Sequence, residues 1–291
     1  MFYFFKAYFR FLLRSTNQHG VHSPFVFGLV TKCFYDHKKY PAYQKIQKHR
    51  KSLLQDKRNI RVTDFGAGSR VFSSDERKVS EIAKNAGITS KRARLLNRLV
   101  NYLNVKNALE LGTSVGLGTT AMAAGNKVQV TTIEGCPETA KVAAEKFREL
   151  GLDNIQLKVG KFEDVIEDRG QWTEDREKNS KFLIPNSKSV SISPKQPTTD
   201  NSQPITAHYD LIYIDGNHQK EATLSYFEKL LSAVHNDSVM IFDDIHWSAE
   251  MEEAWEIIKE HPSVKVTIDT FFWGLVFFRR EQEKEHFVIR A

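Results

Sequence analysis

Cysteine is scarce in this chain of 291 residues, and its scarcity excludes several classes of protein. The two cysteines, Cys33 and Cys136, stand far apart, and no CxxC or Cys/His metal-ligand spacing accompanies them. A disulfide framework and a structural zinc site are therefore not expected, and the thiols fit a reducing compartment.

Long uninterrupted apolar runs are also lacking. The apolar stretch near the N-terminus is broken by Lys6, Arg10 and Arg14, so it is too short to span a bilayer, and no small-residue cleavage site follows it. With 41% hydrophobic and 11% aromatic residues, the chain is nevertheless rich enough in apolar groups to form a core rather than a disordered coil. We expect a globular, cytoplasmic protein.

Positive charge is concentrated at the start of the chain. The first 60 residues contain twelve Lys or Arg and two Asp or Glu, whereas the rest contains thirty basic and thirty-four acidic residues. Lys6, Arg10 and Arg14 recur every fourth residue and form one basic stripe on a helix. Such a helix can lie on an anionic membrane, peripheral to its inner face, or dock on the domain and cover the substrate pocket. The second alternative is favoured because aromatic residues nearly encircle the helix.

From Leu95 onward, helix-like and strand-like segments alternate, which is typical of an α/β fold with a parallel sheet. The pattern predicts a Rossmann-like, doubly wound, mostly parallel seven-stranded sheet (residues 91–291) after an N-terminal basic and aromatic helical extension (residues 1–90). A polar insertion at about 168–207 has no periodicity and is interpreted as an inert loop or, less favoured, as a lid or partner-binding segment. The expected strands are 107–111, 129–133, 155–159, 209–214 and 238–242, followed by a hairpin from 264–268 and 274–279.

Two glycine-bearing segments compete as the cofactor loop, residues 64–70 (DFGAGSR) and residues 110–118 (ELGTSVGLG). The second segment alone is followed by a helix and then by a strand that ends in an acid, Glu134, which can accept hydrogen bonds from ribose hydroxyls. Its spacing is GxxxGxG and not GxGxxG, so the geometry that cradles a dinucleotide pyrophosphate is not specified. We therefore interpret residues 110–118 as the cofactor loop and the first segment as a turn, with Arg70 as a candidate substrate contact.

Five motifs in order, LELGTSVGLGT, VTTIEGCPE, VGKFEDVI, YDLIYIDGNH and SVMIFDDIHW, resemble class I S-adenosylmethionine (SAM)-dependent methyltransferases. The resemblance is strongest to the catechol and caffeoyl-coenzyme A O-methyltransferases, and GVHSPFVF and FGAGSR are similar to an uncharacterised bacterial branch. It implies SAM as the cofactor and the terminal antiparallel hairpin. It also implies a cofactor site whose members are Glu110, Gly112, Thr113, Ser114, Gly116, Glu134, Gly135, Phe162, Glu163 and Asp215.

The sequence differs from the family at one of the two expected catalytic residues, Asp215 and His218. Those O-methyltransferases have a Lys three residues after the Asp, where this sequence has His218. An imidazole can accept a proton near neutral pH, so His218 is a candidate general base or, with equal weight, a structural turn residue. The acceptor need not be a catechol.

A divalent metal is the last expectation from the strand ends. Asp215 follows one predicted strand, and Asp243 and Asp244 follow the next, so parallel pairing would bring three carboxylates together as ligands for Mg²⁺ or another divalent cation. The competing interpretation is that one Asp caps a helix and another orients a histidine.

These observations favour O-methylation of a small-molecule, lipid or glycan hydroxyl. Methylation of RNA or another nucleic acid is a weaker alternative, because neither the Asn/Asp-Pro-Pro-aromatic nor the Pro-Cys motif is present. A non-catalytic binding module on the same scaffold is the second alternative. The sequence leaves the acceptor unidentified and a homodimer open.

Overall fold

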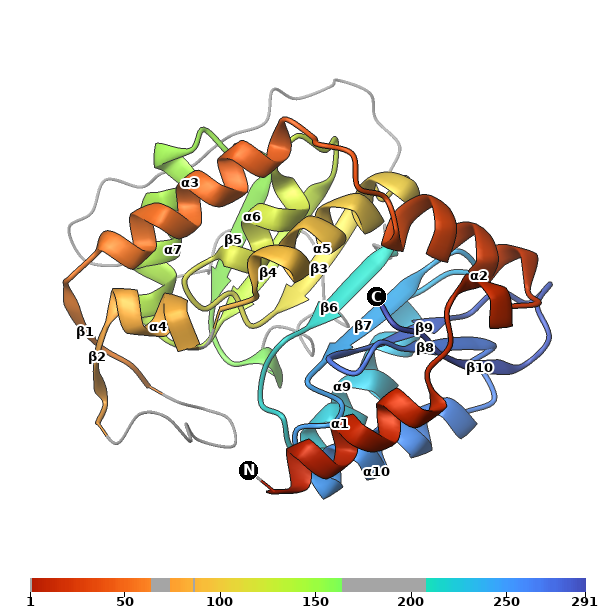
Figure 1. Cartoon of the computed structure of the whole chain (residues 1–291). Helices are drawn as coiled ribbons and strands as arrows, with labels where there is room; N and C mark the ends of the chain where they lie inside the picture. Colours follow the sequence, from red (N-terminus) through yellow and green to blue (C-terminus); the bar gives the residue numbers. More distant parts are fainter. Residues whose placement is uncertain (1, 64–73, 86, 164–207) are drawn as a thin grey trace, which may run out of the picture.

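The computed structural model describes residues 2–63, 74–85, 87–163 and 208–291 (Figure 1). The helices are α1 (Phe2–Arg14), α2 (Pro24–Leu29), α3 (Ala42–Gln55), α4 (Val79–Asn85), α5 (Ser90–Tyr102), α6 (Leu117–Ala123), α7 (Pro137–Glu149), α9 (Lys220–Leu230) and α10 (Ala249–Glu260). The strands are β1 (Asn59–Arg61), β2 (Glu76–Lys78), β3 (Asn107–Leu111), β4 (Gln129–Glu134), β5 (Ile155–Val159), β6 (Leu211–Ile214), β7 (Val239–Asp243), β8 (Val266–Asp269), β9 (Trp273–Phe277) and β10 (Glu285–Val288).

Eight strands form the main sheet in the order β10-β8-β9-β7-β6-β3-β4-β5. The strands from β5 to β7 pair in parallel, and β9 runs antiparallel between β7 and β8. From β3 the chain adds β4 and β5 on one side and then β6 and β7 on the other side. The gap between β3 and β6 is therefore the switch point at which open α/β sheets bind ligands. The predicted fold class and the terminal hairpin are confirmed.

The sheet has one strand more than the seven expected. Residues 285–288 form β10, which pairs in parallel with the edge strand β8. Their sequence, EHFV, has no sustained apolar alternation, and the strand is exposed or half-buried. Without β10, β8 would be the edge of the sheet, with unpaired backbone N–H and C=O groups. Residues 285–288 pair with these groups although their own sequence does not indicate a strand.

Helices cover both faces of the sheet, and the alternation of side chains along each strand separates two apolar clusters. On one face, α2, α3, α5, α6 and α7 pack against alternate strand residues such as Ala108, Val130 and Tyr213. On the other face, α9 and α10 pack against the intervening residues, such as Leu109 and Ile212. The result is a three-layer arrangement with the sheet in the middle (Figure 1).

The N-terminal third contributes to the first of these clusters. Buried residues between Val21 and Val100 belong to the same cluster as the strands, and α3 packs against α4, α5 and α6. The domain division at residue 90 stays a prediction. Among the described residues, no helix combines the length and apolar character that crossing a bilayer requires.

Asn97 on α5 generates the first prediction. Its buried amide Nδ2 donates to the Ala121 and Ala124 carbonyls, at 2.9 and 2.8 Å, where α6 ends. Asn97→Ala removes this donor from two buried acceptors, so we expect a loss of about 1–3 kcal/mol in the free energy of unfolding. Urea denaturation measures it. The matched control is Asn101→Ala, at an exposed position of the same helix, and an equal loss in both variants would contradict the assignment.

Candidate active site

The candidate site lies at the carboxyl edge of β3, β4, β6 and β7, where the turns that follow these strands meet. Residues 112–116 follow β3, Glu134 ends β4, residues 215–218 follow β6, and Asp243 ends β7. The strand pairing β4-β3-β6-β7 makes all four turns neighbours. The structure therefore brings together the residues predicted for the cofactor and those predicted for catalysis.

The backbone of the cofactor loop is shaped by three left-handed residues. Gly112, Ser114 and Gly116 have φ of +105°, +49° and +83°. At Gly112 the reason is close packing: a Cβ would overlap the backbone carbonyl of Asp215, so the β3 and β6 turns approach each other more closely than any side chain permits. Glycine alone combines the positive φ with that approach.

Glu110 lies inside the loop. It is 1% exposed, and its Oε2 accepts hydrogen bonds from Thr119 Oγ1 at 2.5 Å and from Thr132 Oγ1 at 2.6 Å. Burial raises the pKa of Glu110 to about 7, and the two threonine hydrogen bonds act in the opposite direction. These contacts tie β3, β4 and the first turn of α6 together, so Glu110 braces the loop from within. Its predicted place beside the cationic end of a cofactor is untested.

Glu134 holds the loop from the neighbouring strand. Its Oε2 accepts from the Ser114 backbone N–H at 2.6 Å, and its Oε1 accepts from the Cys136 N–H at 2.9 Å. The carboxylate is half-buried at the end of β4, the position at which an acid meets ribose hydroxyls in related nucleotide folds. Gly135 follows it without adding a side chain.

The back of the loop rests on α7 and α3. A Cβ on Gly116 would lie 2.5 Å from Phe147 Cε1 of α7. Beside Phe147, the fully buried His49 of α3 pairs with Thr120 Oγ1 of α6 at 2.8 Å. Burial and the nearby Lys146 charge lower the pKa of His49 to about 4, so the imidazole is neutral.

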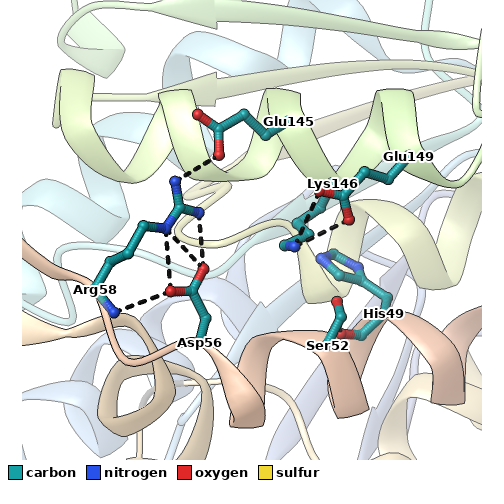
Figure 2. A network of polar contacts seen from close by, with 7 residues as sticks. All are labelled: His49, Ser52, Asp56, Arg58, Glu145, Lys146 and Glu149. Carbon is teal, nitrogen blue, oxygen red and sulfur yellow. Dashed lines mark hydrogen bonds and ion pairs between the residues drawn. The ribbon is translucent and has the colours of Figure 1, made fainter.

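Further along, an ion pair joins the segment after α3 to α7, and a second ion pair lies within α7 (Figure 2). Arg58, just after α3, binds Asp56 at 2.7 Å and Glu145 of α7 at 2.8 Å, and Lys146 binds Glu149 at 2.9 Å. The N-terminal third thus forms the support behind the cofactor loop.

Gly116 and Gly151 provide a matched pair of substitutions. Both have positive φ, but a Cβ on Gly151 would meet nothing within 4 Å. Gly151→Ala should cost about 1–2 kcal/mol from backbone strain alone, whereas Gly116→Ala adds overlap with Phe147 and should cost about 2–5 kcal/mol. Denaturant unfolding compares them. Equal losses would show that the Phe147 contact adds no constraint.

Phe162 and Glu163, predicted members of the cofactor site, lie beside α9. The Phe162 ring packs edge-on against Tyr226 with 5.6 Å between centroids, and Tyr226 Oη donates to Glu163 Oε1 at 2.6 Å. Burial would raise the pKa of Glu163, but hydrogen bonds led by that from Tyr226 outweigh it and lower the pKa. A Cβ on Gly216 would lie 2.8 Å from Phe162, which places this pair against the turn after β6.

Three carboxyl groups form the opposite part of the site. Asp215 and Asp243 are hydrogen-bonded to each other, and Tyr213 Oη donates to Asp215 Oδ2 at 3.1 Å. Burial is the main cause that raises the pKa of Asp215 to about 6, of Asp243 to about 7 and of Asp244 to about 6. The charge of a neighbouring Asp raises each pKa further. Such mutual repulsion requires either a shared proton or a nearby cation.

The cation that the structure supplies is Arg92, which lies where the predicted metal ion would be needed, and the metal site itself stays a prediction. Arg92 Nη1 of α5 lies 2.9 Å from Asp243 Oδ1, and the guanidinium lies over the Phe272 ring at 4.8 Å. No group of three or more His, Cys, Asp or Glu side chains is placed to hold a metal ion in the part of the chain that the structure describes, which includes Asp215, Asp243 and Asp244. The donor set does not fit a divalent ion because a side-chain cation already binds its most buried carboxylate.

His218 lies in the turn after β6. Its Nε2 is 3.9 Å from Asp215 Oδ1, and its side chain is 26% exposed. Asn217 and His218 have φ of +67° and +33°, and Asp244 has φ of +54°. Non-glycine residues in the left-handed region carry strain, and such strain clusters at functional turns.

Sequence reasoning missed Arg92. It lies in an amphipathic helix with several basic residues, a pattern typical of a solvated face. Arg94, two residues on, is exposed and lies over the Tyr43 ring, and nothing in the sequence distinguishes the two arginines. The predicted substrate contact Arg70, its glycine segment 64–70 and the insertion at 168–207 lie outside the described residues.

Comparison with known proteins agrees with this geometry. Residues 109–245 match a family model described as a methyltransferase domain. The SAH-bound methyltransferase PaMTH1 of Podospora anserina has a similar structure, with a TM-score of 0.55, 12% identity, and coverage of 89% of this chain and 97% of that one. The O-methyltransferase TomG of Streptomyces achromogenes, in complex with SAM, has a TM-score of 0.51, 14% identity, and coverage of 83% and 91%. No curated protein matches the sequence.

The fold is that of the class I methyltransferases, and the structural likenesses at 12–14% identity show that fold. The matched segment runs from β3 to just beyond β7 and includes the glycine loop, Glu134, Asp215, His218 and Asp243. The chain therefore resembles the class I O-methyltransferases in the part that carries its candidate site.

Proposed function

We propose that the protein transfers a methyl group from SAM to a hydroxyl oxygen of a small-molecule, lipid or glycan acceptor. The observation that carries the proposal is the close approach of Gly112 to the Asp215 carbonyl. It places the glycine loop, a candidate SAM site, directly beside the Asp and His residues that could act on an acceptor. The match of residues 109–245 to a methyltransferase domain supports it.

On the cofactor side, the loop backbone from Gly112 to Gly116 would lie along the methionine part of SAM, and Glu134 would accept hydrogen bonds from the ribose hydroxyls. Phe162 and Glu163 would border the adenine, since they lie against Gly216 at the far end of the same crevice. SAM carries a positive sulfonium, and the buried acids at this edge favour a cation there.

On the acceptor side, His218 is the proposed general base. The methyl carbon bonds to the acceptor oxygen as its bond to sulfur breaks, the sulfonium becomes a neutral thioether, and the hydroxyl proton passes to the imidazole Nε2. Asp215, 3.9 Å from that nitrogen, would stabilise the imidazolium. In this scheme the positive charge beside Asp243 comes from Arg92.

Arg92 would supply the fixed positive charge of this site. Its contacts with Asp243 and Phe272 hold the guanidinium in one orientation, with 20% of the side chain exposed toward the crevice edge. A preorganised cation near a developing oxyanion stabilises the transition state without a metal ion. Methyl transfer by this protein would then not be inhibited by chelators of divalent metals.

Glu134→Ala tests the cofactor site. The change removes the proposed ribose acceptor and the acceptor of the Ser114 N–H, so we expect SAM affinity to fall about tenfold or more, equivalent to 1–3 kcal/mol. Calorimetric titration of SAM measures it. The control is Glu138→Ala, an exposed acid in the first turn of α7. Undiminished affinity in Glu134→Ala would remove the site assignment, and absence of SAM binding to the unaltered protein would favour a non-catalytic module.

Arg92→Met tests the charge of the acceptor side without requiring the acceptor. Loss of the guanidinium leaves three acids without a cation, so we expect Mn²⁺, followed by electron paramagnetic resonance, to bind the variant more tightly than the unaltered protein. The exposed Arg94→Met serves as control. Tight Mn²⁺ binding by the unaltered protein, abolished in Asp243→Ala, would restore the metal centre.

The acceptor itself can be found by incubating the protein and methyl-labelled SAM with lipid, glycan and small-phenol extracts. Labelling should survive exhaustive chelation and be lost in His218→Ala. Labelling of RNA instead, at physiological salt, would replace the proposed acceptor class with a nucleic acid.

A further inference from the structure

Helix α1 docks on the protein along one side only. Ala7 and Phe11 are buried and form a cluster with Phe271 from the β8–β9 turn. The Arg10 guanidinium donates to both carboxylate oxygens of Glu252 on α10, at 3.1 and 2.9 Å. This fixes the helix lengthwise on the body of the protein, next to α10 (Figure 1). The structure thus shows α1 docked on the domain, whereas covering of the substrate pocket by this helix stays a prediction.

The opposite side of α1 is apolar and exposed. Phe5, Phe9 and Leu13, spaced by four residues, are 63%, 63% and 72% exposed. Tyr8, 41% exposed, lies at the edge of this side, because its ring contacts Phe271 at 4.8 Å between centroids. Four-residue spacing places the first three on one line along the helix. Large apolar side chains at such exposure, contiguous on one face, mark an interaction surface rather than a packing accident.

Charge identifies the partner. Lys6 is exposed beside this line, Arg14 is exposed at the C-terminal end of the helix, and α1 contains no acidic residue. A second copy of the chain docking through the same face would bring these like charges together, which is unfavourable. An anionic surface attracts them while it receives the aromatic and leucine side chains.

We infer that the outer face of α1 binds an anionic lipid bilayer, with the helix lying in the plane of the membrane interface. Phe5, Phe9 and Leu13 enter the boundary between headgroups and acyl chains, and Lys6 and Arg14 contact lipid phosphates. The length of α1, 13 residues, suits a helix that lies on a bilayer rather than one that crosses it.

The docked helix also borders the candidate site. Phe4 of α1 contacts Phe271 and Phe272 at 5.1 and 6.4 Å between centroids, and the Arg92 guanidinium lies over Phe272. Membrane binding would hold the Arg92 side of the crevice near the bilayer, where a lipid hydroxyl is available. This consequence rests on the proposed function, whereas lipid binding does not.

Flotation of the full chain with vesicles tests the inference. Vesicles of phosphatidylcholine with phosphatidylglycerol should carry the protein at low salt, and vesicles of phosphatidylcholine alone should carry much less. Phe5→Ser/Phe9→Ser should lower the bound fraction about tenfold or more, because the helix loses two aromatic side chains that would enter the bilayer. Phe27→Ser/Leu54→Ser is the matched control, because these side chains are 45% and 44% exposed on α2 and α3.

Lys6→Glu/Arg14→Glu should abolish binding to the anionic vesicles while SAM affinity stays unchanged. Failure of the unaltered protein to float with anionic vesicles would overturn the inference, as would equal binding by the Phe5/Phe9 variant and its control. Dimerisation in sedimentation that disappears in the Phe5/Phe9 variant, without vesicle binding, would assign the face to a second copy. SAM titration of the same samples separates these outcomes from a failure of the proposed function.

Discussion

The close approach of the Gly112 backbone to the Asp215 carbonyl is the constraint on which the site depends. This contact joins the turn after β3 to the turn after β6. Only a residue without a Cβ can make it, because the backbone has a φ of +105° and a Cβ would overlap the carbonyl. The parallel pairing of β3 with β6 sets the two turns side by side. The cofactor loop and the acidic turn therefore adjoin and form one candidate site rather than two separate sites.

The balance between the acidic side chains and the Arg92 charge is the second constraint on this site. Burial raises the pKa of Asp215, Asp243 and Asp244, and each charge makes ionisation of its neighbours harder. Arg92 offsets that repulsion at Asp243, where it is closest. A side chain carried by the fold is permanently present, whereas a metal ion has to be acquired and retained.

Segments before residue 103 shape the site although none of them carries its motifs. Helix α3 places the neutral His49 behind the loop, where it pairs with Thr120. Helix α5 supplies Arg92, and α1 packs against the Phe271 and Phe272 turn that supports the guanidinium. The N-terminal third thus connects the cofactor loop, the acidic cluster and the exposed face of α1 within one packed structure.

The sequence by itself determined the five parallel strands, the terminal hairpin and the residues at the carboxyl ends of the strands. Apolar runs such as those of β6 and β7 are buried throughout, and a run of this kind specifies a central parallel strand whatever surrounds it. Only the tertiary structure decided that Glu110 faces inward to two threonines, that β10 joins the sheet, and that Arg92 rather than Arg94 reaches Asp243. These contacts join residues up to 151 positions apart, so they depend on how the helices pack and leave no periodic pattern in the chain.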